Sequence, residues 1–159
     1  INMIYEGTNT IQSLDLLGRK ILMDNGAKLK KFGALVQAFV EENGTDEAMS
    51  EFVTPLADLG DKVTKLTMEI GMKAMQNQDE VGAAAVPYLR VVGHLVYSYF
   101  FARMAKIALA KLDSGDNFYK AKLATTRFYF ARLLPETAML IRQARSGAKP
   151  LLDLEAELF

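Results

Sequence analysis

Residues Glu6 to Thr10 bring side chains that could do chemistry to the start of a predicted helix. A carboxylate can remove a weakly acidic proton when partial burial moves its pKa toward the working range, and Glu6 supplies one. Gly7 has no Cβ, so a substrate could approach closely there. Thr8 and Asn9 then open the helix, whose free N–H groups suit a phosphate-bearing ligand. The segment is therefore a candidate for proton abstraction beside a bound phosphate group.

Glu6 also has a simpler explanation. A carboxylate at a helix start is stabilised by the helix dipole without any catalytic role. For an isolated glutamate this would be the better explanation, so the residues around Glu6 have to decide between the two.

Those residues run from Tyr5 to Gln12 and read Tyr-Glu-Gly-Thr, two further residues, then Ile-Gln. The run resembles the catalytic-base segment of the flavin-dependent acyl-CoA dehydrogenases. The resemblance implies that Glu6 is the catalytic base and that Gly7 contacts an acyl-CoA substrate. It further implies that FAD accepts the β-hydride and that an electron-transfer flavoprotein is the next acceptor. Three cofactor-binding positions are implied as well: Thr8, Asn9 and Thr10.

Other segments resemble bacterial members of this family that carry an extra C-terminal domain, a subgroup similar to 3-methylmercaptopropionyl-CoA dehydrogenase. Because the upstream partners of the motif lie outside these 159 residues, the resemblance implies the C-terminal region of a larger enzyme. We therefore expect the isolated chain to be inactive and not to bind FAD. The segments are 14–20, 83–85, 87–90, 124–129 and 133–135.

The expected domain boundary lies at Asp24–Gly26. Residues 1–25 would end the catalytic region, and residues 26–159 would form a C-terminal helical extension domain. The alternative is that the chain acts as a non-catalytic structural or oligomerisation module, packed on the dehydrogenase body. Apolar surface left exposed would favour self-association, so a homo-oligomer is expected.

Helix-forming residues dominate and alternating apolar–polar runs are rare, which predicts an all-α fold. Long amphipathic stretches joined by short turns predict an antiparallel, up-and-down helical bundle, like the C-terminal region of the acyl-CoA dehydrogenases. A short helix over 151–159 is expected to pack on the body of the bundle. Five main helices are predicted, over 9–23, 27–42, 45–76, 79–112 and 117–146.

Several residues predict where these helices begin and end. Thr8 and Asp116 are expected N-caps, and Thr45 marks the start of the third helix. Proline removes a backbone donor and clashes with the preceding turn. Pro55 is therefore expected to kink or break the third helix, and Pro135 to interrupt the fifth.

Composition narrows the classes of partner. Lys plus Arg and Asp plus Glu are equal at 19 each, so no net charge attracts nucleic acid or anionic lipid, and neither is expected as a partner. The chain has no cysteine, which excludes disulfides and thiolate metal sites, and no metal site is expected. No apolar run is long enough to cross a bilayer, and no signal peptide is visible. These features fit a cytoplasmic protein.

Charge is unevenly spread along the chain. Residues 1–80 carry 13 acidic and 8 basic side chains, whereas residues 81–159 carry 6 acidic and 11 basic ones. Acidic helices packed beside basic helices would explain this, and a basic face for CoA phosphates or an acidic partner is the alternative. The cluster of Lys28, Lys30 and Lys31 is expected to be a solvated helix face. His94, the only histidine, is expected to be a hydrogen-bonded helix residue.

Overall fold

The computed structural model describes residues 8–158, and this part of the chain is helical without any strand. The predicted all-α fold is confirmed. In chain order the elements are α2 (Asn9–Leu14), η1 (Asp15–Leu22), α3 (Ala27–Asn43), η2 (Glu47–Met49), α4 (Ser50–Ala74), α5 (Asp79–Ala110), η3 (Leu112–Ser114), α6 (Asn117–Phe128), η4 (Tyr129–Leu133), α7 (Glu136–Arg145), α8 (Lys149–Leu152) and η5 (Ala156–Leu158).

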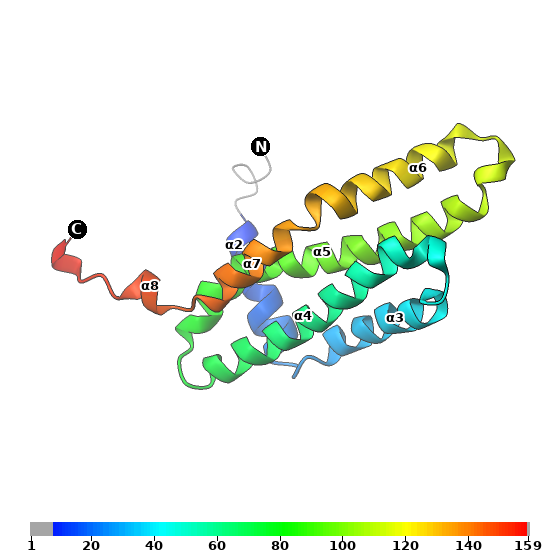
Figure 1. The fold of residues 1–159 in the computed structure, drawn as a ribbon. Helices are drawn as coiled ribbons and strands as arrows, with labels where there is room; N and C mark the ends of the chain where they lie inside the picture. Colours follow the sequence, from blue (N-terminus) through cyan, green and yellow to red (C-terminus); the bar gives the residue numbers. More distant parts are fainter. Residues whose placement is uncertain (1–7, 159) are drawn as a thin grey trace.

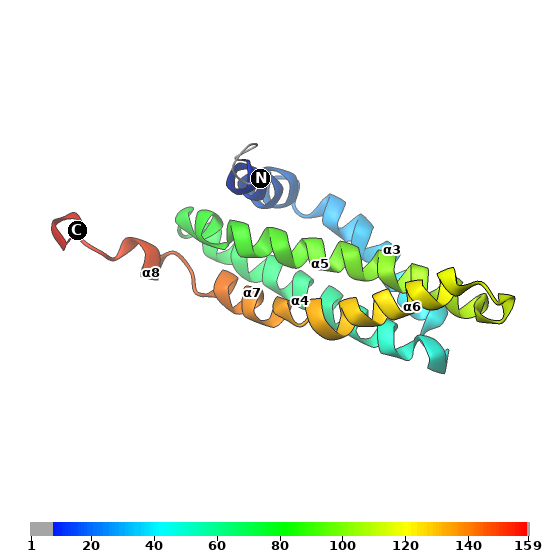
Figure 2. The ribbon, with the colours of Figure 1, turned by 90° about the horizontal axis from the view of Figure 1, so that it is seen from above.

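The long helices form an up-and-down bundle around α5 (Figure 1). α5 packs against α4 on one side and against α6 and α7 on the other, while α3 packs on α4. The α2–η1 helix runs across the bundle rather than along it and also packs on α5 (Figure 2). The arrangement is therefore the predicted one, with α2–η1 held against the central helix.

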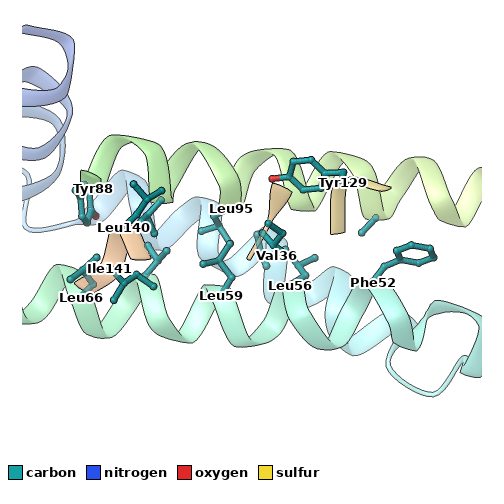
Figure 3. Close-up of a cluster of buried hydrophobic side chains, with 14 of the residues drawn as sticks. Val36, Phe52, Leu56, Leu59, Leu66, Tyr88, Leu95, Tyr129, Leu140 and Ile141 are labelled. Carbon is teal, nitrogen blue, oxygen red and sulfur yellow. The ribbon is translucent and has the colours of Figure 1, made fainter. Parts of the chain in front are cut away.

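The core follows from the spacing of apolar residues on the long helices. On α4, apolar side chains recur every three or four residues, so they share the face that points into the bundle. Side chains from α5 and α7 meet that face (Figure 3). Fully buried members of this core include Phe52, Leu56, Leu66, Tyr88, Val91 and Leu140.

Two segments are π-helical rather than α-helical. In η1 the N–H of Met23 donates to the carbonyl of Gly18 at 3.0 Å, and in η4 the N–H of Leu134 donates to the carbonyl of Tyr129 at 3.0 Å. The second lies directly before Pro135, which has no N–H to continue the α-helical pattern. The predicted interruption at Pro135 is confirmed, because α7 begins at Glu136.

Of the predicted kink or break at Pro55, the break is wrong, since α4 continues through this residue. Pro55 removes one hydrogen bond, the one that the carbonyl of Glu51 would accept. Buried side chains on both sides, Phe52, Val53 and Leu56, hold this part of α4 in the core. Packing therefore outweighs the lost bond, as is usual for helices inside proteins.

Of the start signals predicted at Thr8, Thr45 and Asp116, only the N-cap at Asp116 is confirmed. The Asp116 carboxylate accepts a hydrogen bond from the N–H of Phe118 at 2.8 Å, as expected. Thr8 precedes α2, but its side chain makes no capping hydrogen bond. The third helix is capped by Asp46 rather than started by Thr45, because the Asp46 side chain reaches the N–H of Ala48 at 2.9 Å.

The C-terminal segment does not pack on the bundle as expected. After α7, residues 149–158 extend away from it (Figures 1 and 2). The short helix α8 begins at Lys149 instead of Leu151, and all the leucines that follow are exposed. The extended segment therefore presents apolar side chains to solvent.

Ion pairs join the acidic and basic parts of the chain. Arg127 of α6 makes a two-pronged contact with Glu51 of α4, and Arg145 of α7 does the same with Glu69 of α4. Lys106 of α5 pairs with a glutamate of α3 at 2.7 Å. Acidic helices thus pack beside basic ones, as the sequence predicted. Among residues 8–158, no helix has the length and apolar character that a membrane crossing requires.

Candidate functional site

Two of the sequence-predicted site residues, Glu6 and Gly7, lie outside the described residues. The other three open the first described helix. Thr8 is half-buried, whereas Asn9 and Thr10 are exposed at the start of α2. The first N–H groups of a helix have no partner within it, so this end offers donors as well as polar side chains.

Packing of α2–η1 on the bundle fixes the direction of this helix start. Leu17 is fully buried and Ile21 nearly so. Gly18 faces α5, where an added Cβ would make ordinary van der Waals contact, 3.8 Å from a methyl carbon of Val81. The buried Ser13 hydroxyl donates to the carbonyl of Thr10 at 2.7 Å. Asn9 and Thr10 therefore sit on a firmly held helix.

Thr8, Asn9 and Thr10 fit one edge of a site for a phosphate-bearing cofactor such as FAD. Their side chains offer hydroxyl and amide groups, and Asn9 and Thr10 face solvent. The Thr8 hydroxyl makes no capping hydrogen bond, so the cap does not occupy it. Three such residues could contact one side of a cofactor but could not enclose it.

A polar cluster joins α5 to η4 and α7. The His94 Nδ1 lies 2.9 Å from the Tyr129 hydroxyl, and that hydroxyl donates to the His94 carbonyl at 3.2 Å. Glu136 pairs with Arg90 and lies 4.0 Å from the His94 Nε2. The expectation that His94 is a hydrogen-bonded helix residue is confirmed.

The electrostatics of this cluster favour neutral groups. Burial lowers the pKa of His94, with the carboxylate of Glu136 opposing this effect. Burial raises the pKa of Tyr129 to about 12. At pH 7 the imidazole and the phenol are therefore a neutral hydrogen-bonded pair that ties η4 to α5, rather than a proton-transfer system.

A groove of about 630 Å³ opens between η1, α3 and α4. Small residues on the facing helices leave this space, among them Gly33 on α3 and Gly60 on α4. Lys30 and Gln37 stand on the α3 side, and Asp61 on the α4 side. This groove was not predicted from the sequence, although the small residues that face each other on α3 and α4 were a usable signal. Its apolar lining includes Leu22, Leu29, Val36, Val40, Val63, Met68 and Leu95.

Within residues 8–158, no three His, Cys, Asp or Glu side chains gather in a way that could hold a metal ion. The candidate catalytic chemistry rests on the segment that ends at Thr10.

Known proteins match most of this chain. A family model described as acetyl-CoA dehydrogenase C-terminal like matches residues 32–155, from within α3 to the C-terminal segment. The chain belongs to this family. The resemblance noted from the sequence is thus confirmed.

Curated relatives support the same family. A broad-specificity linear acyl-CoA dehydrogenase, FadE5 of Mycobacterium tuberculosis, is 33% identical over 149 residues, which cover 85% of this chain and 24% of that protein. The 3-methylmercaptopropionyl-CoA dehydrogenase of Ruegeria pomeroyi is 31% identical over 84% of this chain and 23% of its own length. A butyryl-CoA dehydrogenase of Syntrophomonas wolfei is 30% identical over 86% of this chain. The chain thus spans about a quarter of the length of these relatives.

Proposed function

We propose that this member of the acetyl-CoA dehydrogenase C-terminal-like family works as the C-terminal part of a longer FAD-dependent acyl-CoA dehydrogenase. The observation that carries the proposal is the Tyr5–Gln12 run, which stands upstream of residues 32–155, the part of the chain that the family model matches. Relatives named acyl-CoA dehydrogenases, about four times as long as the matched region, support it.

In this proposal each residue of the run has its own task. Glu6 takes the α-proton of an acyl-CoA thioester, and Gly7 leaves room for the thioester to approach the carboxylate. Thr8, Asn9 and Thr10 hold FAD by its polar groups. Bound FAD would supply acceptance of the β-hydride, which gives a 2-enoyl-CoA as product. The firm packing of α2–η1 on α5 would keep these residues in register with the cofactor.

The proposal also covers the domain division, the electron acceptor, the oligomeric state and the cellular location. Residues 1–25 would belong to the catalytic region and residues 26–159 to the extension domain. An electron-transfer flavoprotein would receive the electrons, the enzyme would be a homo-oligomer, and the location would be cytoplasmic. The 159-residue chain alone would be inactive and would not retain FAD, because three residues make only an edge of the flavin site.

The test is a Glu6→Gln variant of the full-length polypeptide. Loss of a general base lowers turnover by roughly 100-fold or more, and an isosteric amide leaves flavin content unchanged. Glu47→Gln is the matched control, since Glu47 is exposed and makes no ion pair within the described residues. Undiminished acyl-CoA oxidation by Glu6→Gln would exclude Glu6 as the base.

A second candidate function is a structural module that packs on a dehydrogenase body. The bundle has its own buried core, and its polar cluster of Arg90, His94, Tyr129 and Glu136 is built for hydrogen bonding. Deleting residues 27–159 from the full-length polypeptide should then change its oligomeric state or its acyl-chain preference. If both stay unchanged, the module does not have these roles.

A further inference from the structure

The C-terminal arm, residues 149–158, carries leucines that the bundle leaves more than half exposed. Exposed fractions are 67% for Leu151, 60% for Leu152, 51% for Leu154 and 69% for Leu158. The arm extends away from the end of α7 (Figure 1). Apolar groups gathered on an exposed segment mark an interaction surface more often than a solvated end.

The root of the arm is firmly fixed to the bundle. Gly147 adopts a left-handed conformation with φ +79°, which turns the chain after α7. The N–H of the buried Ala148 then donates to the Glu80 carboxylate at 3.1 Å. Lys73 donates to the Arg145 carbonyl at 2.9 Å on the same end of the bundle. The arm therefore leaves the bundle in a defined direction.

The bundle offers the arm two concave places. A shallow hollow near the root of the arm is bordered by Leu14 and Val81. Leu151 and Leu152 are the only arm residues that line it, and both remain more than half exposed. The second is the deeper groove between η1, α3 and α4. In the view of Figure 2, α3 and α7 lie on opposite sides of α5. α3 borders this groove, whereas the arm follows α7. The arm of another copy can approach this groove without crossing the bundle.

The charges of arm and groove complement each other. Asp153 pairs with Lys149 inside the arm at 3.7 Å, whereas Glu155 and Glu157 make no ion pair within residues 8–158. Lys30 lines the α3 side of the groove and makes no ion pair within residues 8–158. Its neighbour Lys31 does not line the groove, is exposed and makes no ion pair there either, while Lys28 pairs with Asp24. Asp61 is the acidic group on the α4 side, so an arm would turn its glutamates toward α3. The interface would combine apolar contact between the arm leucines and the groove with the acidic edge of the arm against the basic α3 edge of the groove.

We propose that two copies of this chain exchange their C-terminal arms, each arm lying in the α3–α4 groove of the other copy. The arm leucines cover the apolar lining of the groove, and Glu155 and Glu157 face Lys30 and Lys31. Such an interface is symmetric, because each copy gives an arm and receives one. The inference concerns assembly and holds whether or not the proposed catalytic role is correct.

Sedimentation of the 159-residue chain, whose helices share one core of their own, tests the exchange over roughly 1 to 100 µM. We expect a dimer. Deleting residues 149–159 removes the arm, and Gly33→Leu fills the groove at a helix position with open space around it. Each change should raise the dimer dissociation constant by at least about tenfold. The matched control is Gly93→Leu, a helix position with equally open space outside the groove, and it should leave the dimer unchanged.

A mixing experiment separates arm exchange from other dimers. The arm-deleted chain keeps an open groove and the Gly33→Leu chain keeps its arm, so an equimolar mixture should form a heterodimer more stable than either homodimer. A wild-type chain that stays monomeric overturns the proposal. So does a dimer that survives arm deletion, or a mixture that gains nothing.

Crosslinking locates the arm directly, because the chain has no cysteine of its own. Chains carrying Leu154→Cys are mixed with chains carrying Gln37→Cys in the groove, and the oxidised mixture should yield a disulfide-linked heterodimer. Lys120→Cys, an exposed position on α6, serves as the control partner and should not crosslink. Equal crosslinking at both positions would overturn the proposed location.

Discussion

Gly147 is the most informative single position for the stability of the bundle end, because two independent constraints meet there. Its φ of +79° is one that other residues adopt only with strain. A Cβ added to it would also stand 2.9 Å from a Glu80 carboxylate oxygen, which is the group that accepts a hydrogen bond from Ala148. Gly115 has the same φ of +79° with nothing near its would-be Cβ. The two glycines thus separate backbone strain from loss of the Glu80 contact.

The expected magnitudes differ accordingly. Gly115→Ala should cost about 1 kcal/mol, the penalty of a left-handed conformation for a residue with a Cβ. Gly147→Ala carries the same penalty and also displaces the Glu80 carboxylate. A hydrogen bond to a charged group contributes about 1.5 kcal/mol at the lower end of its range, and the lower end applies because the glutamate side chain can move aside. The total for Gly147→Ala is therefore about 2.5 kcal/mol.

Urea unfolding followed by helical circular dichroism measures both variants, with equal slopes required for the comparison. In a Glu80→Ala background, Gly147→Ala should no longer carry the additional loss of unfolding free energy, and it should cost the same as Gly115→Ala. Equal losses for the two glycines in the wild-type background would refute the assigned role of Glu80.

Three further predictions concern the core and its ionisable groups. Leu56→Ala should cost about 2 to 5 kcal/mol in urea unfolding because Leu56 is fully buried, whereas Leu35→Ala on an exposed position should stay within about 0.5 kcal/mol. Because the pKa of His94 is lowered in the folded state, its contribution to stability is present above the ordinary pKa of 6.5 and is lost as the pH falls. Wild type should therefore lose more stability than His94→Asn between pH 7 and pH 5. Parallel plots of unfolding free energy against pH for the two proteins would contradict this. Burial raises the pKa of Tyr88 to about 12, and its hydroxyl forms a 2.6 Å hydrogen bond with the Thr67 hydroxyl. The contribution of Tyr88 to stability should therefore be full below pH 10 and fall as the pH rises toward 12. Tyr88→Phe should reduce this alkaline loss of stability, and an equal loss in the variant would contradict the prediction.

The sequence predicted those parts of the fold that depend on local signals. Apolar spacing located the long helices, and the loop residues around Gly44 and Gly115 separated them where the structure does. Asp116 was recognised as a cap because a short acidic side chain before a helix needs no distant partner. Membership of the family followed from a short motif and from diffuse likeness along the bundle.

Features that depend on distant contacts were missed. The continuity of α4 through Pro55 comes from buried neighbours, and the π-helical turn at Tyr129 comes from a register change before Pro135. The contact of Glu80 with Ala148 joins residues 68 positions apart, which no local pattern reveals. For the candidate site, the likeness to the family supplied residues, while packing of α2–η1 on α5 supplied the support that the sequence alone did not indicate.

Anaerobic bleaching of the flavin in the full-length polypeptide measures whether Glu6 acts on acyl-CoA beside FAD. Bound FAD would supply hydride acceptance, so the visible absorbance of the flavin should fall when a saturated acyl-CoA is added. Glu6→Gln should keep its flavin and its acyl-CoA binding but bleach at least about 100-fold more slowly. A polypeptide that holds no flavin, or a Glu6→Gln variant that bleaches at the wild-type rate, would exclude Glu6 as the base beside FAD.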